Sequence, residues 1–135
     1  YVTAGNNGNE YRLKAKSGKT NPKNNDVLDL IDVKGKITSP VRPTVYIISD
    51  YAEYNSANQN SKFYDNVIIN YENKEIKCDN FDINIETNVA VAYNNVVVTD
   101  PKSIMYAGKI ILDIKTKDID IRPENEVSKV NIISN

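Results

Sequence analysis

The sequence contains no histidine and no tryptophan, and it has one cysteine and five glycines among its 135 residues. Without histidine it lacks the usual general base, the Ser-His-Asp and Cys-His nucleophile pairs and the donors of most zinc sites. It also shows no glycine-rich phosphate-binding loop and no calcium-binding EF-hand pattern. We therefore expect a protein that is not an enzyme and that carries no cofactor and no metal.

Carboxylate chemistry is the one catalytic route that these absences leave. Asp79 with Asp82, and Asp118 with Asp120, form carboxylate pairs, and glycoside hydrolysis requires two carboxyl groups about 5 to 10 Å apart. The aspartates of residues 118–122 alternate with isoleucines, however, and this pattern is typical of a strand with one solvated face. We therefore favour a structural role for these carboxylates.

Charge and hydropathy exclude further classes of protein. The 17 basic and 18 acidic side chains leave a net charge of -1, whereas nucleic-acid-binding domains carry a basic surface, so no nucleic-acid partner is expected. The longest apolar run, residues 89–93, is far shorter than the ~20 residues that span a bilayer. Cys78 has no second cysteine to pair with, and we expect a free thiol packed in the interior. The length predicts one domain over residues 1–135.

Alternation of apolar and polar residues recurs along the chain. Residues 11–16 read Tyr-Arg-Leu-Lys-Ala-Lys, which places one face inward and the other in water. No stretch of ten or more residues has the helical spacing of apolar positions, so we expect almost no helix. Turn-forming residues gather at 20–25, 55–60 and 100–102. The alternation predicts further strands at residues 45–49, 67–71, 75–85, 89–99, 109–117, 118–121 and 130–133.

An internal repeat of 29 residues is the most informative feature of the sequence. A shift by 29 places Asp50 on Asp79 and Asn66 on Asn95. A second shift keeps two apolar columns, whose members are Ala52, Phe81 and Ile110 in the first and Tyr54, Ile83 and Leu112 in the second.

A repeat that holds two strands and two turns indicates a hairpin unit that buries its apolar side only by stacking on the next unit. The first quarter of the chain fits the same plan more loosely, with residues 30–33 in the place that residues 64–67 occupy later. The sequence therefore predicts an all-β fold in which hairpin repeats form a curved stack.

Several short segments have the form of a known repeat. Residues 49–55 (Ser-Asp-Tyr-Ala-Glu-Tyr-Asn) lead into residues 64–67 (Tyr-Asp-Asn-Val), where Asp65 takes the usual place of a glycine. Residues 8–16 form an opening strand after a glycine and asparagine turn, and residues 104–108 end on a glycine before the final strands. In order and spacing, these segments resemble the LptC-like periplasmic domains of the lipopolysaccharide export (Lpt) bridge, within the OstA/LptA-like superfamily. The resemblance extends over nearly the whole chain.

The resemblance implies a twisted, open β-jellyroll whose two sheets face each other across an apolar groove. In such a groove the acyl chains of lipid A lie inside and the sugars stay outside. The inward alternation of several strands agrees with a groove, and it agrees equally with a closed core, as in most sandwiches. Only the resemblance favours the groove. The residues that it implies for lipid binding are Tyr54, Val67, Ile69, Phe81, Ile83, Ile85, Val96, Val98, Gly108, Ile110, Leu112 and Ile114.

An open stack also leaves unpaired strand edges, which are templates for a strand from another chain. The resemblance implies that the C-terminal edge, residues 129–133, continues into an LptA-like periplasmic protein. It implies that the N-terminal edge, residues 11–16, meets an inner-membrane ABC transporter. For the last strand a frayed tail is an equal alternative. The edge residues expected to bind partners are Tyr11, Leu13, Ala15, Val130 and Ile132.

The function that the resemblance implies is non-enzymatic transport of lipopolysaccharide across the periplasm of a Gram-negative bacterium, in outer-membrane biogenesis. The domain would bridge the inner-membrane transporter to the LptA-like protein. The resemblance also implies a membrane anchor upstream, and a chain that begins with Tyr1 and not with methionine leaves room for one. The alternative is a β-repeat scaffold that assembles through its strand edges without binding lipid, and a densely packed interior would favour it.

Overall fold

The fold is given by a computed structural model that describes residues 2–6, 8–114, 116, 118–122 and 131–134. Regular structure in these residues is entirely β, as the alternation predicts. No helix that could cross a membrane occurs in this part of the chain. The strands are β1 (Val2–Asn6), β2 (Asn9–Asn21), β3 (Asn24–Ser39), β4 (Arg42–Asn55), β5 (Ser61–Tyr71), β6 (Lys74–Asn84), β7 (Val89–Thr99), β8 (Ser103–Asp113), β9 (Ile119–Arg122) and β10 (Asn131–Ser134).

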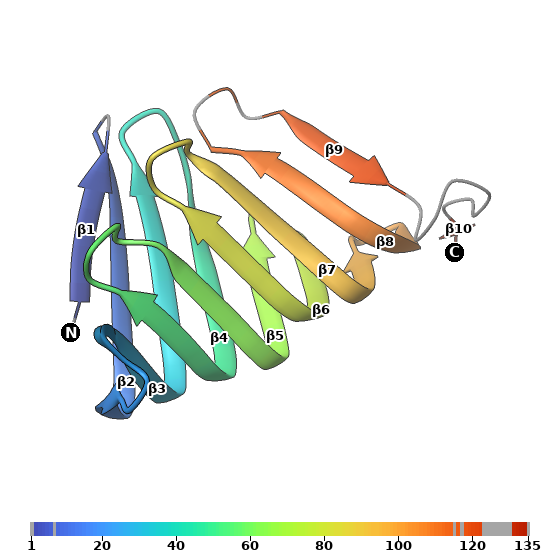
Figure 1. The fold of residues 1–135 in the computed structure, drawn as a ribbon. Coiled ribbons are helices and arrows are strands. Elements are labelled where there is room, and N and C mark those ends of the chain that lie inside the picture. The colour runs from blue at the N-terminus through green and yellow to red at the C-terminus, as the bar shows by residue number, and fades with distance from the viewer. Residues whose placement is uncertain (1, 7, 115, 117, 123–130, 135) are drawn as a thin grey trace.

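All ten strands belong to one antiparallel sheet (Figure 1), so the two facing sheets that the resemblance implies are two halves of a single bent sheet. The strand order follows the chain from β1 to β8, and β9 and β10 both pair with β8. Consecutive strands are therefore neighbours, which is the arrangement that stacked hairpins predict. The open all-β architecture itself is confirmed, since β1 and β10 lie at opposite ends of the strand order.

The long strands bend near their middle, and this bend turns one sheet into two facing halves. The pairing register breaks between Ile48 and Tyr51 in β4, and between Tyr93 and Val96 in β7. Bulged residues at such breaks increase the local bend of a strand. Figure 1 shows the strands turning back on themselves along the lower side of the view.

The two halves are named here by their strand segments. The first half-sheet contains β1 and β10, together with residues 9–15, 33–39, 42–48, 67–71, 74–78, 96–99 and 103–107 of β2 to β8. The second half-sheet contains β9, together with residues 17–21, 24–31, 51–55, 61–64, 80–84, 89–93 and 109–113 of the same strands.

Asp and Asn positions that recur every 29 residues lie at the bend of the strands. Asn66 has a left-handed backbone with φ of 54°, and its side-chain amide donates to Asp50 at 2.6 Å. Asn95 has φ of 56° and donates to Asp79 in the same way, also at 2.6 Å. Asparagine tolerates the left-handed region better than most residues. The repeated Asp and Asn positions are therefore the hydrogen-bonded corner of each hairpin unit.

The corner predicts an unequal response to two substitutions of Asn66. Asn66→Ala should lower the free energy of unfolding by about 1–2 kcal/mol, because alanine at positive φ is strained and the hydrogen bond to Asp50 is lost. Asn66→Gly loses the same hydrogen bond without the strain and should cost less. Urea unfolding followed by circular dichroism measures both variants, and equal losses would contradict this account of the corner.

The looser first copy of the repeat is also confirmed as a corner. Asp32 has φ of 55°, at the place that Asn66 holds in β5. The residues that follow these corners, Val33 and Val67, are both buried, as the next one in the series, Val96, is. Each corner thus has a polar residue with a left-handed backbone directly before an inward valine.

Phe63 and Phe81 lie at the centre of the core between the half-sheets. Both side chains are fully buried, and their ring centroids are 6.0 Å apart. Gly35 leaves room for them on β3, since a Cβ atom there would lie 3.1 Å from Cζ of Phe63. This aromatic pair separates two parts of the interior that differ in packing.

Candidate functional site

The interior is filled near β2 and hollow near β8 and β9. The part near β2 holds a pocket of only ≈ 10 Å³, whereas a cavity of ≈ 220 Å³ lies toward the C-terminal strands. The larger volume is many times the roughly 10–15 Å³ that one water molecule needs, and an apolar cavity of roughly 150 Å³ is known to stay dry and to bind a small hydrocarbon. The two parts are called the closed end and the groove.

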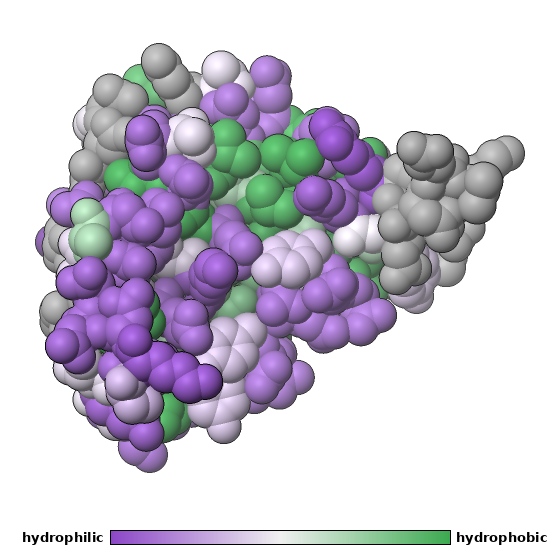
Figure 2. All heavy atoms as spheres, viewed as in Figure 1, coloured by the Kyte–Doolittle hydropathy of each residue, from purple (hydrophilic) through white to green (hydrophobic). Residues whose placement is uncertain are grey.

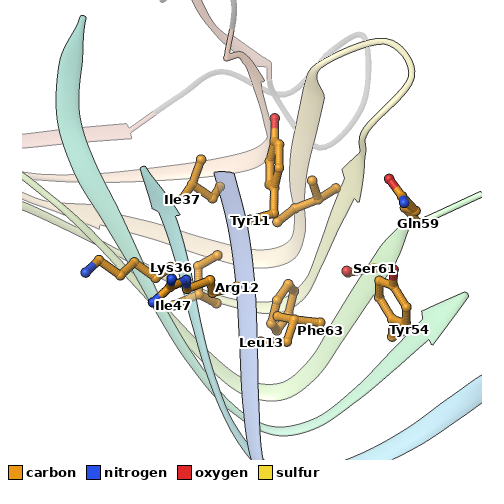
Figure 3. A pocket seen from close by; sticks show the side chains of 11 residues that line it. Tyr11, Arg12, Leu13, Lys36, Ile37, Ile47, Tyr54, Gln59, Ser61 and Phe63 are labelled. Carbon is orange, nitrogen blue, oxygen red and sulfur yellow. The ribbon is translucent and has the colours of Figure 1, made fainter. Parts of the chain in front are cut away.

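Large side chains fill the closed end. Figure 3 shows Tyr11, Leu13, Tyr54 and Phe63 around its small pocket, which β2, β3, β4, β5 and β6 line together. Tyr11, Leu13 and Tyr54 are all less than 9% exposed. Aromatic rings from both half-sheets therefore occupy the space that remains open farther along the sheet.

A hydrogen bond between the half-sheets holds the closed end together. The hydroxyl of Tyr11, in the first half-sheet, donates to Oδ1 of Asn88 at 3.1 Å, in the turn that joins β6 to β7. Asn88 is itself buried, and its carbonyl oxygen accepts from the amide of Ile114. Burial raises the pKa of the Tyr11 hydroxyl, which therefore stays protonated as a donor at neutral pH.

Tyr11→Phe should cost about 1–3 kcal/mol of unfolding free energy, because it leaves the buried Oδ1 of Asn88 without its donor. Tyr54→Phe is the matched control, since Tyr54 is equally buried and no side-chain hydrogen bond is found for its hydroxyl among the described residues. Chemical denaturation of both variants gives the comparison. A loss for Tyr54→Phe as large as that for Tyr11→Phe would show that the hydrogen bond is not the cause.

The groove lies between aliphatic side chains of the two half-sheets. Figure 2 shows apolar residues gathered where Figure 1 places β8 and β9, with hydrophilic residues around them. From the first half-sheet the apolar and aromatic lining is Ile37, Val45, Ile69, Tyr71, Ile76, Val98 and Met105, and from the second it is Phe81, Ala90, Ile110, Leu112, Ile119 and Ile121, with Ile114 just beyond β8.

Polar residues line the groove where the two half-sheets end. On the first half-sheet these are Arg42, Lys74 and Ser103, with Asp100 beside them in the turn after β7. On the second they are Asp113 and, in the turn after β8, Asp118. An apolar interior with a polar rim suits a ligand that has hydrocarbon on one side and a polar group on the other.

The structure divides the twelve residues predicted to bind lipid into three groups. Six of them line the groove, namely Ile69, Phe81, Val98, Ile110, Leu112 and Ile114. Tyr54 and Ile83 line the small pocket of the closed end. Val67, Ile85 and Val96 are buried in the core away from both spaces, and Gly108 lies half-buried in β8 at the bend.

Other groove residues were not predicted from the sequence. Ile119 and Ile121 belong to a strand whose alternation was recognised, so the signal for them was present. Arg42 lies between two prolines after a turn and has no pattern that marks it. Met105 was seen only as part of a turn motif, whereas it lies on β8 and faces the groove.

The expected N-terminal edge lies partly inside the sheet. β1 pairs with residues 9–13 of β2, so Tyr11 and Leu13 are covered by another strand and their side chains are buried. Ala15 lies beyond this pairing and is half-buried. At the other end, Ile132 is in β10 and pairs with Met105, while Val130 lies outside the described residues.

The carboxylate pairs and the cysteine have structural surroundings. Asp79 accepts from Asn95, and Asp82 accepts from the hydroxyl of Tyr93. Asp118 and Asp120 are exposed and accept from neighbouring residues of their own turn and strand. Cys78 is a buried free thiol, as expected, and burial raises its pKa to about 12. No group of residues suited to a metal ion occurs in the part of the chain that the structure describes.

Comparison with protein families identifies the family of this chain. A model of the family described as "Lipopolysaccharide-assembly, LptC-related" matches residues 1–123. The chain belongs to the LptC-related family. Its role is therefore in lipopolysaccharide transport, as a member of a family of periplasmic proteins in outer-membrane biogenesis. No curated protein sequence matches the chain.

A solved structure supports the architecture of this LptC-related chain. The fold of this chain is similar to the crystal structure of LptH, described as the LptA-homologous periplasmic component of the lipopolysaccharide transport device from Pseudomonas aeruginosa. The TM-score is 0.64 at 11% sequence identity, over 91% of this chain and 93% of LptH. The likeness confirms the open jellyroll-like fold predicted from the resemblance.

Proposed function

We propose that this LptC-related domain carries lipopolysaccharide by holding acyl chains of lipid A in the groove, without catalysis. The observation that carries this proposal is the ≈ 220 Å³ cavity with mainly aliphatic walls between the half-sheets. Acyl chains in the groove would leave water, and each buried methylene contributes about 0.8 kcal/mol. The sugars would stay at the polar rim.

The interior is filled at the end near β2 and hollow near β8 and β9, so the two ends of the groove differ. Bulky side chains and the Tyr11 to Asn88 hydrogen bond close the end near β2, whereas the groove reaches β8 and β9. Acyl chains would therefore occupy the C-terminal part of the domain. A ligand there lies beside the strands at the end of the sheet, and it would pass to a protein that continues the sheet from that end.

We propose further that the sheet edges join this domain to its partners in a periplasmic bridge. An unpaired strand edge accepts a strand from another chain, and the main-chain hydrogen bonds supply affinity. β9 and β10 form the C-terminal edge, each pairing with β8, and they would receive an LptA-like protein. β1, and not residues 11–13 of β2, would be the strand of the first half-sheet that meets the inner-membrane transporter.

Binding of lipid A with and without its acyl chains tests the main proposal. Lipid A should displace an apolar fluorescent dye from the protein, whereas the fully deacylated disaccharide should displace none at the same concentration. The deacylated form keeps the phosphates and sugars, so it controls for binding at the rim alone. If neither form displaces the dye while the fold is intact, a scaffold that assembles through its edges becomes the better account.

A further inference from the structure

Arg42 has a hydrogen-bond donor that the described residues do not satisfy. Its Nε is buried from solvent and has no partner among them, although the side chain lines the groove. A guanidinium keeps its positive charge in proteins, so it cannot lose the donor by deprotonation. An unpaired buried donor is unfavourable, and buried polar groups of this kind call for a partner.

Lys74 brings a second positive charge to the same rim. It begins β6, where it pairs with Tyr71, and Tyr71 in turn pairs with Val45 of β4, three residues after Arg42. Lys74 is exposed and also lines the groove. Neither Lys74 nor Arg42 forms a salt bridge with any described residue.

The acidic residues of the groove already have partners in their own turns. Asp100 accepts from the amides of Lys102 and Ser103, each at 2.8 Å, and these hydrogen bonds lower its pKa. On the opposite rim, Asp113 accepts from the amide of Thr116, and Asp118 accepts from the Thr116 hydroxyl. These carboxylates shape the turns. Asp100 lies on the rim of Arg42 and Lys74, and the charge of Lys74 also lowers its pKa, whereas Asp113 and Asp118 lie on the opposite rim. The two cations leave the Arg42 side with a surplus of positive charge, so the negative charge of a ligand is favoured there.

We infer that Arg42 and Lys74 form an anion-binding site at the rim of the groove, which takes a phosphate group of the amphiphile whose acyl chains lie inside. This inference rests on the proposed function. A guanidinium presents paired donors that match the oxygens of a phosphate, and a lysine adds a point charge. Because solvent does not reach the Nε of Arg42 in the free chain, the side chain would turn on binding so that its guanidinium, Nε included, meets the phosphate, and the head group would lie toward β4 and β6.

The test compares lipid A forms that share their acyl chains but carry two, one or no phosphate groups. Dissociation constants are measured for the unaltered chain and for Arg42→Gln, Lys74→Gln and the double variant. The unaltered chain should prefer the phosphorylated forms by about tenfold or more, and the double variant should lose this preference. Lys77→Gln and Lys109→Gln, which change exposed lysines outside the groove lining, should keep it.

Two further arms separate the possible results. Inorganic phosphate at millimolar concentration should not displace the phosphorylated lipid, and displacement would assign the site to free phosphate instead of a lipid head group. Arg42→Lys should retain part of the preference, which excludes a folding defect as the cause of its loss. If Arg42→Gln and Lys74→Gln both keep the full preference, the inference is wrong while acyl-chain binding stands. If no form of lipid A binds the unaltered chain, the proposed function and the inference both fail.

Discussion

Phe63→Ala should lower the free energy of unfolding by about 3–5 kcal/mol, the largest loss expected from a single substitution here. The ring is fully buried and packs on Phe81 and on the backbone of Gly35, so its removal leaves a cavity that a bent sheet cannot easily close. Urea unfolding followed by circular dichroism measures the loss. Because most domains have a total stability of about 5–15 kcal/mol, the variant should be close to unfolding at physiological temperature.

A matched surface variant controls for the loss of an aromatic ring as such. Tyr106→Ala removes a ring that is 43% exposed on the same sheet, and such changes usually stay within about 0.5 kcal/mol. A loss below about 1 kcal/mol for Phe63→Ala would mean that the two half-sheets do not pack through this ring.

Leu112→Asp should weaken the binding of lipid A by about a hundredfold while the domain stays folded. Leu112 is only half-buried and lines the groove, so the carboxylate can remain hydrated in the free protein. In the complex it would face acyl chains, and a charge without water or a partner is strongly unfavourable. A hundredfold change corresponds to about 2.8 kcal/mol.

Ile111→Asp is the control for this prediction, because Ile111 directly precedes Leu112 in β8 and does not line the groove. It introduces the same charge at a similar degree of exposure. Dye displacement by lipid A measures both variants. Equal weakening by the two substitutions would point to a general effect of charge on β8, and no weakening by Leu112→Asp would place the acyl chains elsewhere.

The fold class could be predicted because the repeat combines several independent signals. The 29-residue shift aligns Asp50 with Asp79 and Asn66 with Asn95. In the structure each Asn donates to the Asp of its own unit, and the pair forms the hydrogen-bonded corner of that unit. Turn chemistry of this kind is local, so a sequence carries it directly. The resemblance to the LptC-like family then ordered the units into an open jellyroll.

The single sheet could not be predicted because a bend inside a strand interrupts alternation without ending the pairing. β3 runs from Asn24 to Ser39, yet most of it was recognised only as a loose copy of the repeat. Its positive φ at Asp32 shifts the inward positions by one, and period-two patterns on either side then read as unrelated segments. The ends of β8 were misjudged for a similar reason.

The extent of the groove could not be predicted from the sequence either. Ile83 and Leu112 occupy equivalent positions of the repeat, and both point inward. Ile83 lies with Tyr11 and Phe63 in the closed end, whereas Leu112 lines the groove. The difference depends on which side chains approach from the other half-sheet, and alternation within one strand carries no information about them.

The first strand of the N-terminal edge could not be predicted because β1 has little apolar character. Residues 2–6 read Val-Thr-Ala-Gly-Asn, which gives no clear strand signal, so the alternation predicts residues 11–16 as the outermost strand. Main-chain pairing with β2 nevertheless extends over all five residues of β1.

Photocrosslinking to lipopolysaccharide tests the central claim, that acyl chains lie in the groove at the C-terminal part of the domain. A photoreactive residue is placed in turn at Leu112 and Met105 in the groove, at Leu13 and Ile83 in the closed end, and at Tyr106 on the outside. The account predicts crosslinks from Leu112 and Met105 only. Crosslinks of equal yield from Leu13 and Ile83, or crosslinks from Tyr106 alone, would contradict it.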